Sequence, residues 1–259
     1  MSGTDAATAH GRKTRLRLPP SVHACLFDLD GVLTDTATVH AEAWKATFDR
    51  LLQRRALTDG VAFVAFDPVR DYDEYVDGRP REDGVRAFLG SRGIHLPEGD
   101  GQDSPRAETI HGIANRKNAL VLELIHRNGV VPFLGSVRFV RAARAAGLPC
   151  GVVSASANCC EVLEAAGLAS LFDVRVDGVV AAARHLRGKP APDTYREAAR
   201  MLGVAPANAA VFEDALAGVA AARAGGFGYI VGVDRVGQED ALRARGADVV
   251  VHDLGELLR

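Results

Sequence analysis

The sequence lacks the features that mark membrane, secreted and nucleic-acid-binding proteins. Its longest apolar runs are far shorter than the roughly 20 residues that cross a bilayer. Its net charge of −2 provides no overall attraction to nucleic acid or to an anionic membrane. The four cysteines include no C-x-x-C pair, and no histidine pair has zinc-site spacing. We therefore expect a protein of the reducing cytoplasm, with no nucleic-acid or membrane partner.

The bulk composition is that of an ordinary globular protein. Hydrophobic residues make up 47% and charged residues 25% of the 259 residues, enough for one large domain or two modest ones. Residues 1–20 carry basic side chains but no apolar stretch, so they do not resemble a signal peptide. We expect a flexible arm over residues 1–21.

One stretch carries an unusual pair of acids. The apolar run 22–27 ends at Asp28 and Asp30, and Gly31 follows, where the backbone can turn sharply. Alternate side chains of a strand share a face, so we expect the two carboxylates to point the same way. Because neighbouring acids repel unless a positive charge lies between them, this spacing favours a cation site. An ordinary Asp-rich turn explains the stretch equally well when it is considered alone.

The remainder of the chain predicts an α/β fold with an insertion. Beyond residue 132, four helical segments each end at a glycine before a short apolar strand, as a parallel sheet covered by helices requires. Residues 36–133 show helical periodicity and only one ambiguous apolar run, at 61–66. We therefore expect a Rossmann-like core formed by residues 22–35 and 134–259, with a helical cap domain at 36–133. The predicted helix-ending glycines are Gly147, Gly167, Gly203 and Gly225.

Polar residues follow several of the predicted strands. In open parallel sheets the ligand binds at the carboxyl ends of the strands. The pair Asp28 and Asp30 follows the first strand, residues 154–156 (Ser-Ala-Ser) follow the second, and Glu213 and Asp214 close a later one. A Gly-Lys-Pro turn containing Lys189 lies between them in the sequence. We expect these side chains to meet at one edge of the sheet.

Such a set of residues is suited to phosphoryl transfer. Asp28 is the candidate nucleophile, because a carboxylate can form an aspartyl-phosphate. Asp30 is then free to move protons. The added negative charge calls for Mg²⁺, a hard cation that suits Asp28, Asp214 and a carbonyl near Asp30. The donors that would stabilise the transferring phosphoryl group are the Lys189 ammonium, the Ser154 hydroxyl and the Ala155 N–H.

Each of these residues also has an ordinary explanation. Ser154 could cap the following helix, Lys189 could be a solvated loop lysine, and Glu213 with Asp214 could simply begin a helix. Their joint occurrence at successive strand ends makes coincidence a poor explanation.

The same residues resemble the four motifs of the haloacid-dehalogenase-like phosphotransferase superfamily. The resemblance covers the whole core in the family's order, with a cap inserted after the first motif. It implies Asp28 as nucleophile, Asp30 as acid and base, and Mg²⁺ bound by Asp28, the Asp30 carbonyl and Asp214, with Glu213 in support. True dehalogenases lack the second aspartate, so Asp30 argues against that activity. The resemblance to the superfamily rests on residues 28–33 (DLDGVL), Ser154, residues 188–193 (GKPAPD) and residues 212–218 (FEDALAG).

The predicted cap resembles the β-phosphoglucomutase branch of this superfamily. The similar stretches are residues 34–37 (TDTA) with His40 and Trp44, 81–83 (RED), 116–118 (RKN) and 154–158 (SASAN). The resemblance implies that Arg81, Ser156 and Asn158 grip a distal phosphate, and that Thr36, His40 and Lys117 lie near the sugar. From the residues alone, His40 could equally be an interhelical histidine and Arg81 part of a surface ion pair. The segment 66–103 is longer than a minimal cap of this branch.

The resemblance implies a Mg²⁺-dependent phosphomutase that interconverts β-glucose 1-phosphate and glucose 6-phosphate. We expect a monomer that takes a small sugar phosphate. A sugar-phosphate phosphatase would use the same core residues, and a non-catalytic sugar-phosphate sensor could use the same fold. The sequence contains neither a P-loop nor a dinucleotide fingerprint, because the required glycines are missing around Lys189 and around residues 226–228.

Overall fold

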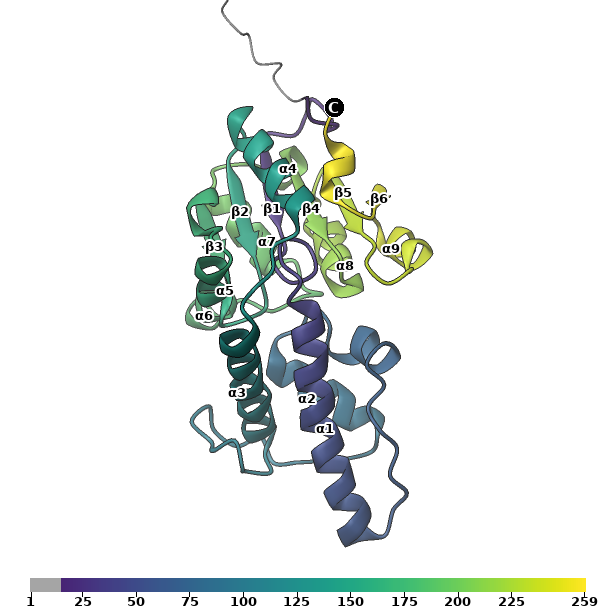
Figure 1. The fold of residues 1–259 in the computed structure, drawn as a ribbon. Helices are drawn as coiled ribbons and strands as arrows, with labels where there is room; N and C mark the ends of the chain where they lie inside the picture. Colours follow the sequence, from purple (N-terminus) through teal and green to yellow (C-terminus); the bar gives the residue numbers. More distant parts are fainter. Residues whose placement is uncertain (1–14) are drawn as a thin grey trace, which may run out of the picture.

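The computed structural model describes residues 15–259, which form an α/β core and a helical lobe (Figure 1). The core is a six-stranded sheet in the order β3-β2-β1-β4-β5-β6, and every neighbouring pair of strands is parallel. This confirms the predicted fold class. The strands are β1 (Ala24–Phe27), β2 (Cys150–Val153), β3 (Val174–Val176), β4 (Ala209–Glu213), β5 (Tyr229–Val233) and β6 (Val249–Val251).

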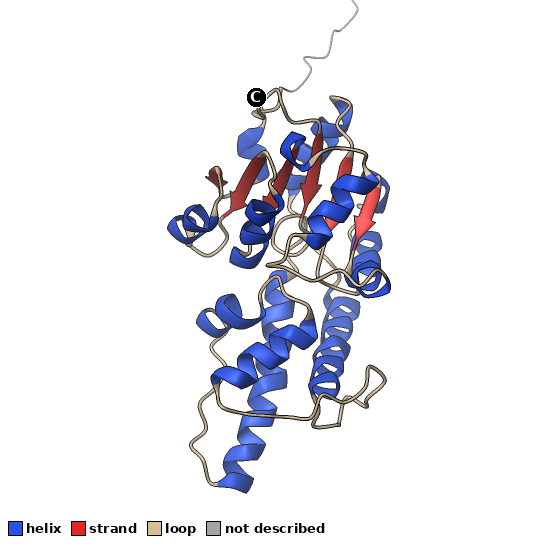
Figure 2. Ribbon diagram, turned by 180° about the vertical axis from the view of Figure 1, so that it is seen from behind, coloured by secondary structure: helices blue, strands red, loops and turns tan. Residues whose placement is uncertain are grey.

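Helices cover both faces of the sheet (Figure 2). In the central strand β1, Cys25 and Phe27 pack into the cluster that includes α4 and α5, whereas Ala24 and Leu26 pack into the cluster that includes α7, α8 and α9. The alternation explains why the strand is apolar throughout, since both of its faces are buried. The core helices are α4 (Leu134–Ala145), α5 (Cys159–Ala165), α6 (Gly178–Ala183), α7 (Asp193–Met201), α8 (Leu216–Gly225) and α9 (Glu239–Arg245).

The lobe inserted after β1 is helical and has its own apolar core. Trp44, Phe48, Phe66 and Phe88 pack there, with the Phe48 and Phe88 rings 4.2 Å apart. The ambiguous run 61–66 forms no strand; it is coil, and Phe66 is its only buried residue. Within residues 15–259, no helix is both long and apolar enough to cross a membrane. The elements of the lobe are α1 (Ala37–Asp59), the π-helical turn Tyr72–Val76, α2 (Arg81–Ser91) and α3 (Ile110–Asn128).

Two expectations from the sequence need correction. Helix α8 includes Gly225 and takes its left-handed cap at Gly226, with φ +75°, because Gly225 is the residue against which the Phe227 ring packs. Most of the expected flexible arm, residues 1–14, lies outside the described part of the chain. Its remainder is ordered: Leu16 pairs antiparallel with Leu258, and Leu16 and Leu18 pack on the core.

We expect Phe212→Ala to lower the free energy of unfolding by about 3–5 kcal/mol. The Phe212 ring is fully buried, stacks on Phe27 at 4.5 Å and lies 5.0 Å from Phe139, so its removal leaves a cavity in the middle of the core. Urea unfolding followed by circular dichroism measures the loss. Val236→Ala, which shortens a side chain that is 58% exposed, is the control and should change stability little. A similar loss in both variants would contradict the expectation.

Candidate active site

The strand-end residues meet at one edge of the sheet. Asp28 follows β1 directly, and its N–H donates to Phe212 O at 2.9 Å, which continues the pairing with β4. Ser154 follows β2, and its N–H donates to Val176 O at 3.0 Å. Glu213 is the last residue of β4, and Lys189 precedes α7. Parallel strands therefore bring Asp28, Ser154 and Glu213 to the same edge, and the loop before α7 brings Lys189 there, as the sequence predicts.

Lys189 joins two of the acids in a buried ion triad. Its ammonium donates to Asp28 Oδ1 and Glu213 Oε1, and to Val153 O at 3.3 Å, and it lies 5.0 Å from the Tyr195 ring. With 3% of its surface exposed, Lys189 is no solvated loop lysine. Burial by itself lowers the pKa of Lys189, but Asp28 and Glu213 outweigh it and hold that pKa well above the usual value. The lysine therefore carries a fixed positive charge beside Asp28.

Glu213 is fixed by neighbours that satisfy both of its oxygens. The Tyr195 hydroxyl donates to Oε1 at 3.0 Å, and the Ala215 N–H donates to Oε2 at 2.9 Å. Glu213 is fully buried, and a methyl group on Gly218 would overlap its carboxylate. The role of Glu213 is therefore to hold Lys189 rather than to meet a substrate.

Asp214 has no such partners. Its carboxylate is 8% exposed and, among residues 15–259, neither a basic side chain nor a hydrogen-bond donor pairs with it. Burial raises the pKa of Asp214 well above its usual value, and Asp77 and Asp28 raise it further. A buried carboxylate without a partner is unstable as an anion unless a cation neutralises it.

The donors at this edge fit a magnesium ion. Asp28, Asp214 and the Asp30 carbonyl supply two carboxylates and one backbone oxygen, and Mg²⁺ is usually held by one or two carboxylates with several waters. Among the described residues, no three His, Cys, Asp or Glu side chains lie together as a metal site, so the protein would supply only these three oxygens. An ion here would therefore keep positions free for water and phosphate.

Asp30 lies beside the nucleophile candidate and faces the lobe. It accepts a hydrogen bond from the Thr36 hydroxyl; Ser154 Oγ lies 3.5 Å from its Oδ2, and His40 Nε2 lies 3.8 Å from its Oδ1. Ser154 does not cap α5, because its hydroxyl accepts from the Ser156 N–H at 3.0 Å. Asp28 and Asp30 thus have separate surroundings, which suits separate roles.

Two basic side chains of the lobe lie close together beside Asp30. His40 Nδ1 is 3.0 Å from Lys117 Nζ, which in turn lies 4.9 Å from the Trp44 ring. Burial lowers the pKa of Lys117 to about 7, against the opposing effect of Asp30. Burial also lowers the pKa of His40 to about 4, and Lys117 adds to that shift. The lobe therefore presents a lysine that gains its charge readily when an anion arrives.

A cavity of about 830 Å³ lies between the core and the lobe. Three of the predicted site residues do not line this cavity, namely Thr36, Asn158 and Glu213. Each of them instead bonds to a residue that does: Thr36 to Asp30, Asn158 to Asn118 at 2.8 Å, and Glu213 to Lys189. The Ala155 N–H has no partner among the described residues and remains free to donate. The predicted residues that line the cavity are Asp28, Asp30, His40, Arg81, Lys117, Ser154, Ala155, Ser156, Lys189 and Asp214.

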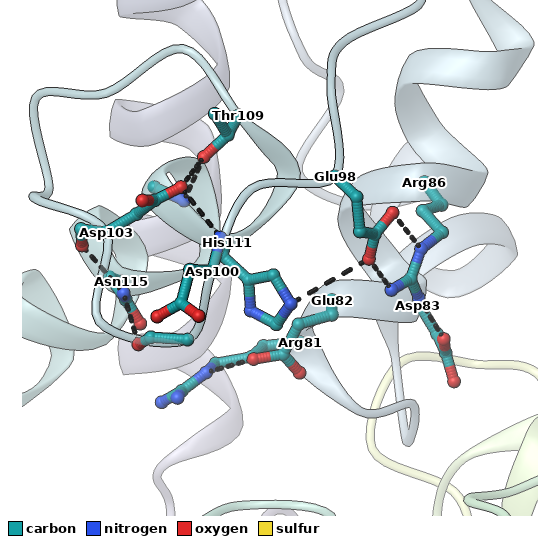
Figure 3. A network of polar contacts seen from close by, with 12 residues as sticks. Arg81, Glu82, Asp83, Arg86, Glu98, Asp100, Asp103, Thr109, His111 and Asn115 are labelled. Atoms are coloured by element: carbon teal, nitrogen blue, oxygen red, sulfur yellow. Dashed lines mark hydrogen bonds and ion pairs between the residues drawn. The ribbon is translucent and has the colours of Figure 1, made fainter.

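A polar network of the lobe includes several residues that line this cavity (Figure 3). Arg81 pairs with Glu82 through Nε at 2.8 Å, which leaves its terminal nitrogens without a partner among the described residues. Arg86 binds Asp83 at 2.6 Å and also Glu98, and His111 lies 3.8 Å from Glu98. Glu98, in the segment 66–103, thereby holds two residues that line the cavity, Arg86 and His111.

Several residues of the site were missed in the sequence. Asp77 lines the cavity from the lobe, and Tyr195 supports Glu213 from α7. Arg235 donates to Gly31 O at 2.8 Å, and Gln238 donates to Asp214 O at 3.2 Å. The acidic run around Asp77 was visible as a change in composition, whereas the other three gave no signal beyond their positions after a helix or strand.

Comparisons with known proteins agree with this geometry. The family described as haloacid dehalogenase-like hydrolase matches residues 22–226. The chain therefore belongs to the haloacid dehalogenase-like hydrolase family, and it is an enzyme of the phosphotransferase type.

Its relatives place it within that family. The chain is 54% identical over 250 residues to a β-phosphoglucomutase of Mycobacterium tuberculosis, covering 95% of each protein, and 31% identical to one of Bacillus subtilis, covering 90% of this chain and 91% of that one. A crystal structure of β-phosphoglucomutase from Clostridium difficile superimposes with a TM-score of 0.70 at 27% identity, covering 91% and 93% of the two chains. The chain thus belongs to the β-phosphoglucomutase-like branch.

We expect Gly31→Ala to abolish most of the phosphoryl-transfer activity. Its cost in the free energy of unfolding should be little more than that of Gly147→Ala. Gly31 has φ +84°, and a methyl group there would overlap Oδ2 of Asp214. Gly147→Ala is the matched control, because Gly147 has φ +81° but nothing within 4 Å of the added methyl group. Both variants should lose about 1–2 kcal/mol from backbone strain, measured by urea unfolding, and only the first should lose phosphoryl transfer. Equal activity in the two variants would contradict the placement of Asp214.

We expect Lys117 to make stability rise between pH 7 and pH 9.5. Its folded pKa is about 7, below the 10.5 of a free lysine, so in this range the unfolded state binds more protons and the free energy of unfolding increases with pH. Relative to Lys117→Met, the wild type should gain at most about 1.4 kcal/mol per pH unit. Urea unfolding at several pH values measures the difference. Lys45→Met, at a half-exposed lysine of α1, is the control, and a flat difference for Lys117→Met would refute the shift.

Proposed function

We propose that the protein is a Mg²⁺-dependent phosphomutase that interconverts β-glucose 1-phosphate and glucose 6-phosphate. The observation that carries the proposal is the arrangement of Asp28, fixed by Lys189 and facing the cavity, with Asp30 beside it in a separate environment. The identity of 54% to a mycobacterial β-phosphoglucomutase supports the choice of reaction. We further propose that it acts in the cytoplasm as a monomer.

The reaction consists of two phosphoryl transfers that use one nucleophile. Phosphorylated Asp28 gives its phosphoryl group to the 6-hydroxyl of β-glucose 1-phosphate, whose proton passes to Asp30, and a glucose bisphosphate forms. After the bisphosphate turns round, Asp28 attacks the phosphorus at the 1-position. The bond between that phosphorus and the sugar oxygen breaks, Asp30 returns the proton to that oxygen, and glucose 6-phosphate leaves.

The charge that accumulates in these steps is met by groups around Asp28. Lys189, the Ser154 hydroxyl and the free Ala155 N–H would face the equatorial oxygens of the transferring group. Asp28, Asp214 and the Asp30 carbonyl would bind the magnesium ion, and Glu213 supports the set through Lys189. The ion supplies neutralisation of the phosphoryl charge when it is bound.

The other end of the cavity suits the second phosphate of the substrate. The terminal nitrogens of Arg81 and the Ser156 side chain line that region, and Lys117 lies between them and Asp30. Two residues that do not line the cavity support this arrangement. Thr36 orients Asp30 through its hydroxyl, and Asn158 of the core bonds to Asn118 of the lobe. A bisphosphate can therefore be held at both ends while either phosphate faces Asp28.

The alternative is a sugar-phosphate phosphatase, in which water resolves the aspartyl-phosphate. A coupled assay with β-glucose 1-phosphate and a trace of glucose 1,6-bisphosphate separates the two, because glucose 6-phosphate dehydrogenase detects only the mutase product. We expect glucose 6-phosphate to form without matching release of inorganic phosphate. Phosphate release without glucose 6-phosphate would instead establish the phosphatase.

Asp28→Asn should lower turnover by more than about 1,000-fold in either assay, because the nucleophile is removed. Asp35→Asn, which alters an exposed acid in the same region, is the control and should retain activity. Full activity of Asp28→Asn would refute catalysis through an aspartyl-phosphate at this residue. The non-catalytic sugar-phosphate sensor would then be the better explanation of the fold.

A further inference from the structure

The lobe contributes an acid of its own to the cavity. Asp77 follows the π-helical turn Tyr72–Val76, and its N–H donates to Tyr72 O at 2.9 Å. Its side chain lines the same cavity as Asp28, Asp214 and Lys189, although it comes from the other part of the protein. None of the reaction steps above uses it.

The segment that carries Asp77 is seated directly on the core. A methyl group on Gly78 would lie 3.1 Å from Cβ of Ala215, the residue after Asp214. Pro80 packs so closely against Gly188, the residue before Lys189, that a methyl group there would overlap its ring. Where the lobe meets the core, Asp77 therefore lies beside the two loops that carry Asp214 and Lys189.

The core already holds an excess of negative charge at this point. Asp28, Asp30, Glu213 and Asp214 carry four negative charges here, and the fully buried cation of the core, Lys189, donates to Asp28 and Glu213. The half-buried Arg235 lies nearby but donates to Gly31 O and His252 O rather than to a carboxylate. Asp214 is 8% exposed and unpaired, and Asp77 likewise has no basic partner among the described residues. Burial, with Glu213 and Asp73, raises the pKa of Asp77 to about 7, which shows how unfavourable a further anion is here.

We propose that Asp77 is a positioning residue that couples closure of the lobe to the divalent cation. Without the cation, closure adds a carboxylate to an uncompensated negative site, and repulsion in the buried cleft opposes it. The bound cation changes the summed charge of the four core carboxylates and Lys189 from −3 to −1, and the ion itself attracts the Asp77 carboxylate, so the repulsion that opposes closure falls. Binding and closure are then thermodynamically reciprocal, so each strengthens the other by the same factor.

The inference rests on the cation of the proposed function, so the experiment measures cation binding directly. Isothermal titration with MgCl₂, in the absence of substrate, gives the dissociation constant for the wild type, Asp77→Asn and Asp214→Asn. Glu74→Gln is the matched control, because Glu74 lies exposed on the same π-helical turn and does not line the cavity. Thermal unfolding checks that each variant folds.

We expect Asp77→Asn to weaken magnesium binding by about 10-fold, as loss of a group that orients a metal's surroundings typically does. Glu74→Gln should bind as the wild type does, and Asp214→Asn should lose binding. Small-angle scattering gives the second measurement: the wild type should become more compact on addition of MgCl₂, whereas Asp77→Asn should be compact already and change little.

Two results would overturn the inference in different ways. If Asp214→Asn loses magnesium binding but Asp77→Asn binds and compacts as the wild type does, Asp77 has no part in the coupling and the proposed function stands. A raised KM for the sugar phosphate alone would then assign Asp77 to a sugar hydroxyl. If the wild type binds no magnesium, the inference falls together with the cation of the proposed function.

Discussion

The buried triad of Lys189, Asp28 and Glu213 is the interaction on which the rest of the site depends. A carboxylate next to other acids would take up a proton if it were buried without a cation, and a protonated Asp28 could not attack phosphorus. Burial, with Glu213 and Asp30, raises the pKa of Asp28 well above its usual value, and the Lys189 ammonium opposes that shift. Lys189 is in turn held by Glu213, which Tyr195 and Ala215 fix in place. Reactivity at the end of β1 therefore depends on packing at the ends of β4 and α7.

Charge is divided unevenly across the cavity. The core presents carboxylates around Lys189, and the lobe presents Arg81 together with Lys117 and His40, the last two beside Asp30. The proposed substrate, with a phosphate at each end, fits such a division, because one phosphate would meet the lobe's cations while the other would meet a metal-loaded core. In the proposed reaction both the lobe and the core are therefore needed to hold the bisphosphate.

The sequence predicted the parts of this arrangement that depend on local order along the chain. Strand ends bring Asp28, Ser154 and Asp214 together whatever the loops do, so those residues could be placed in advance. Lys189 lies in the loop before α7, and it was predicted from its Gly-Lys-Pro turn. Asp77 could not, because its position is set by how the π-helical turn docks on Ala215, a contact between segments over 130 residues apart. Thr36 and Asn158 were expected to contact the substrate, but they do not line the cavity and instead bond to residues that do. Spacing along the chain does not distinguish a residue that lines a cavity from one that supports it. The cap of α8 fell one residue later than expected because Phe227 packs on Gly225, which no local pattern reports.

The position of Trp44 has a consequence of its own. The sequence contains a single tryptophan, and its indole lies in the lobe, stacked on Phe48 and 4.9 Å from the Lys117 ammonium. The emission of an indole responds to nearby charge, and Lys117 is a lysine whose charge depends on its surroundings. The protein thus carries a natural optical probe at the point where the lobe meets an anionic ligand, so ligand arrival can be followed in the unlabelled chain.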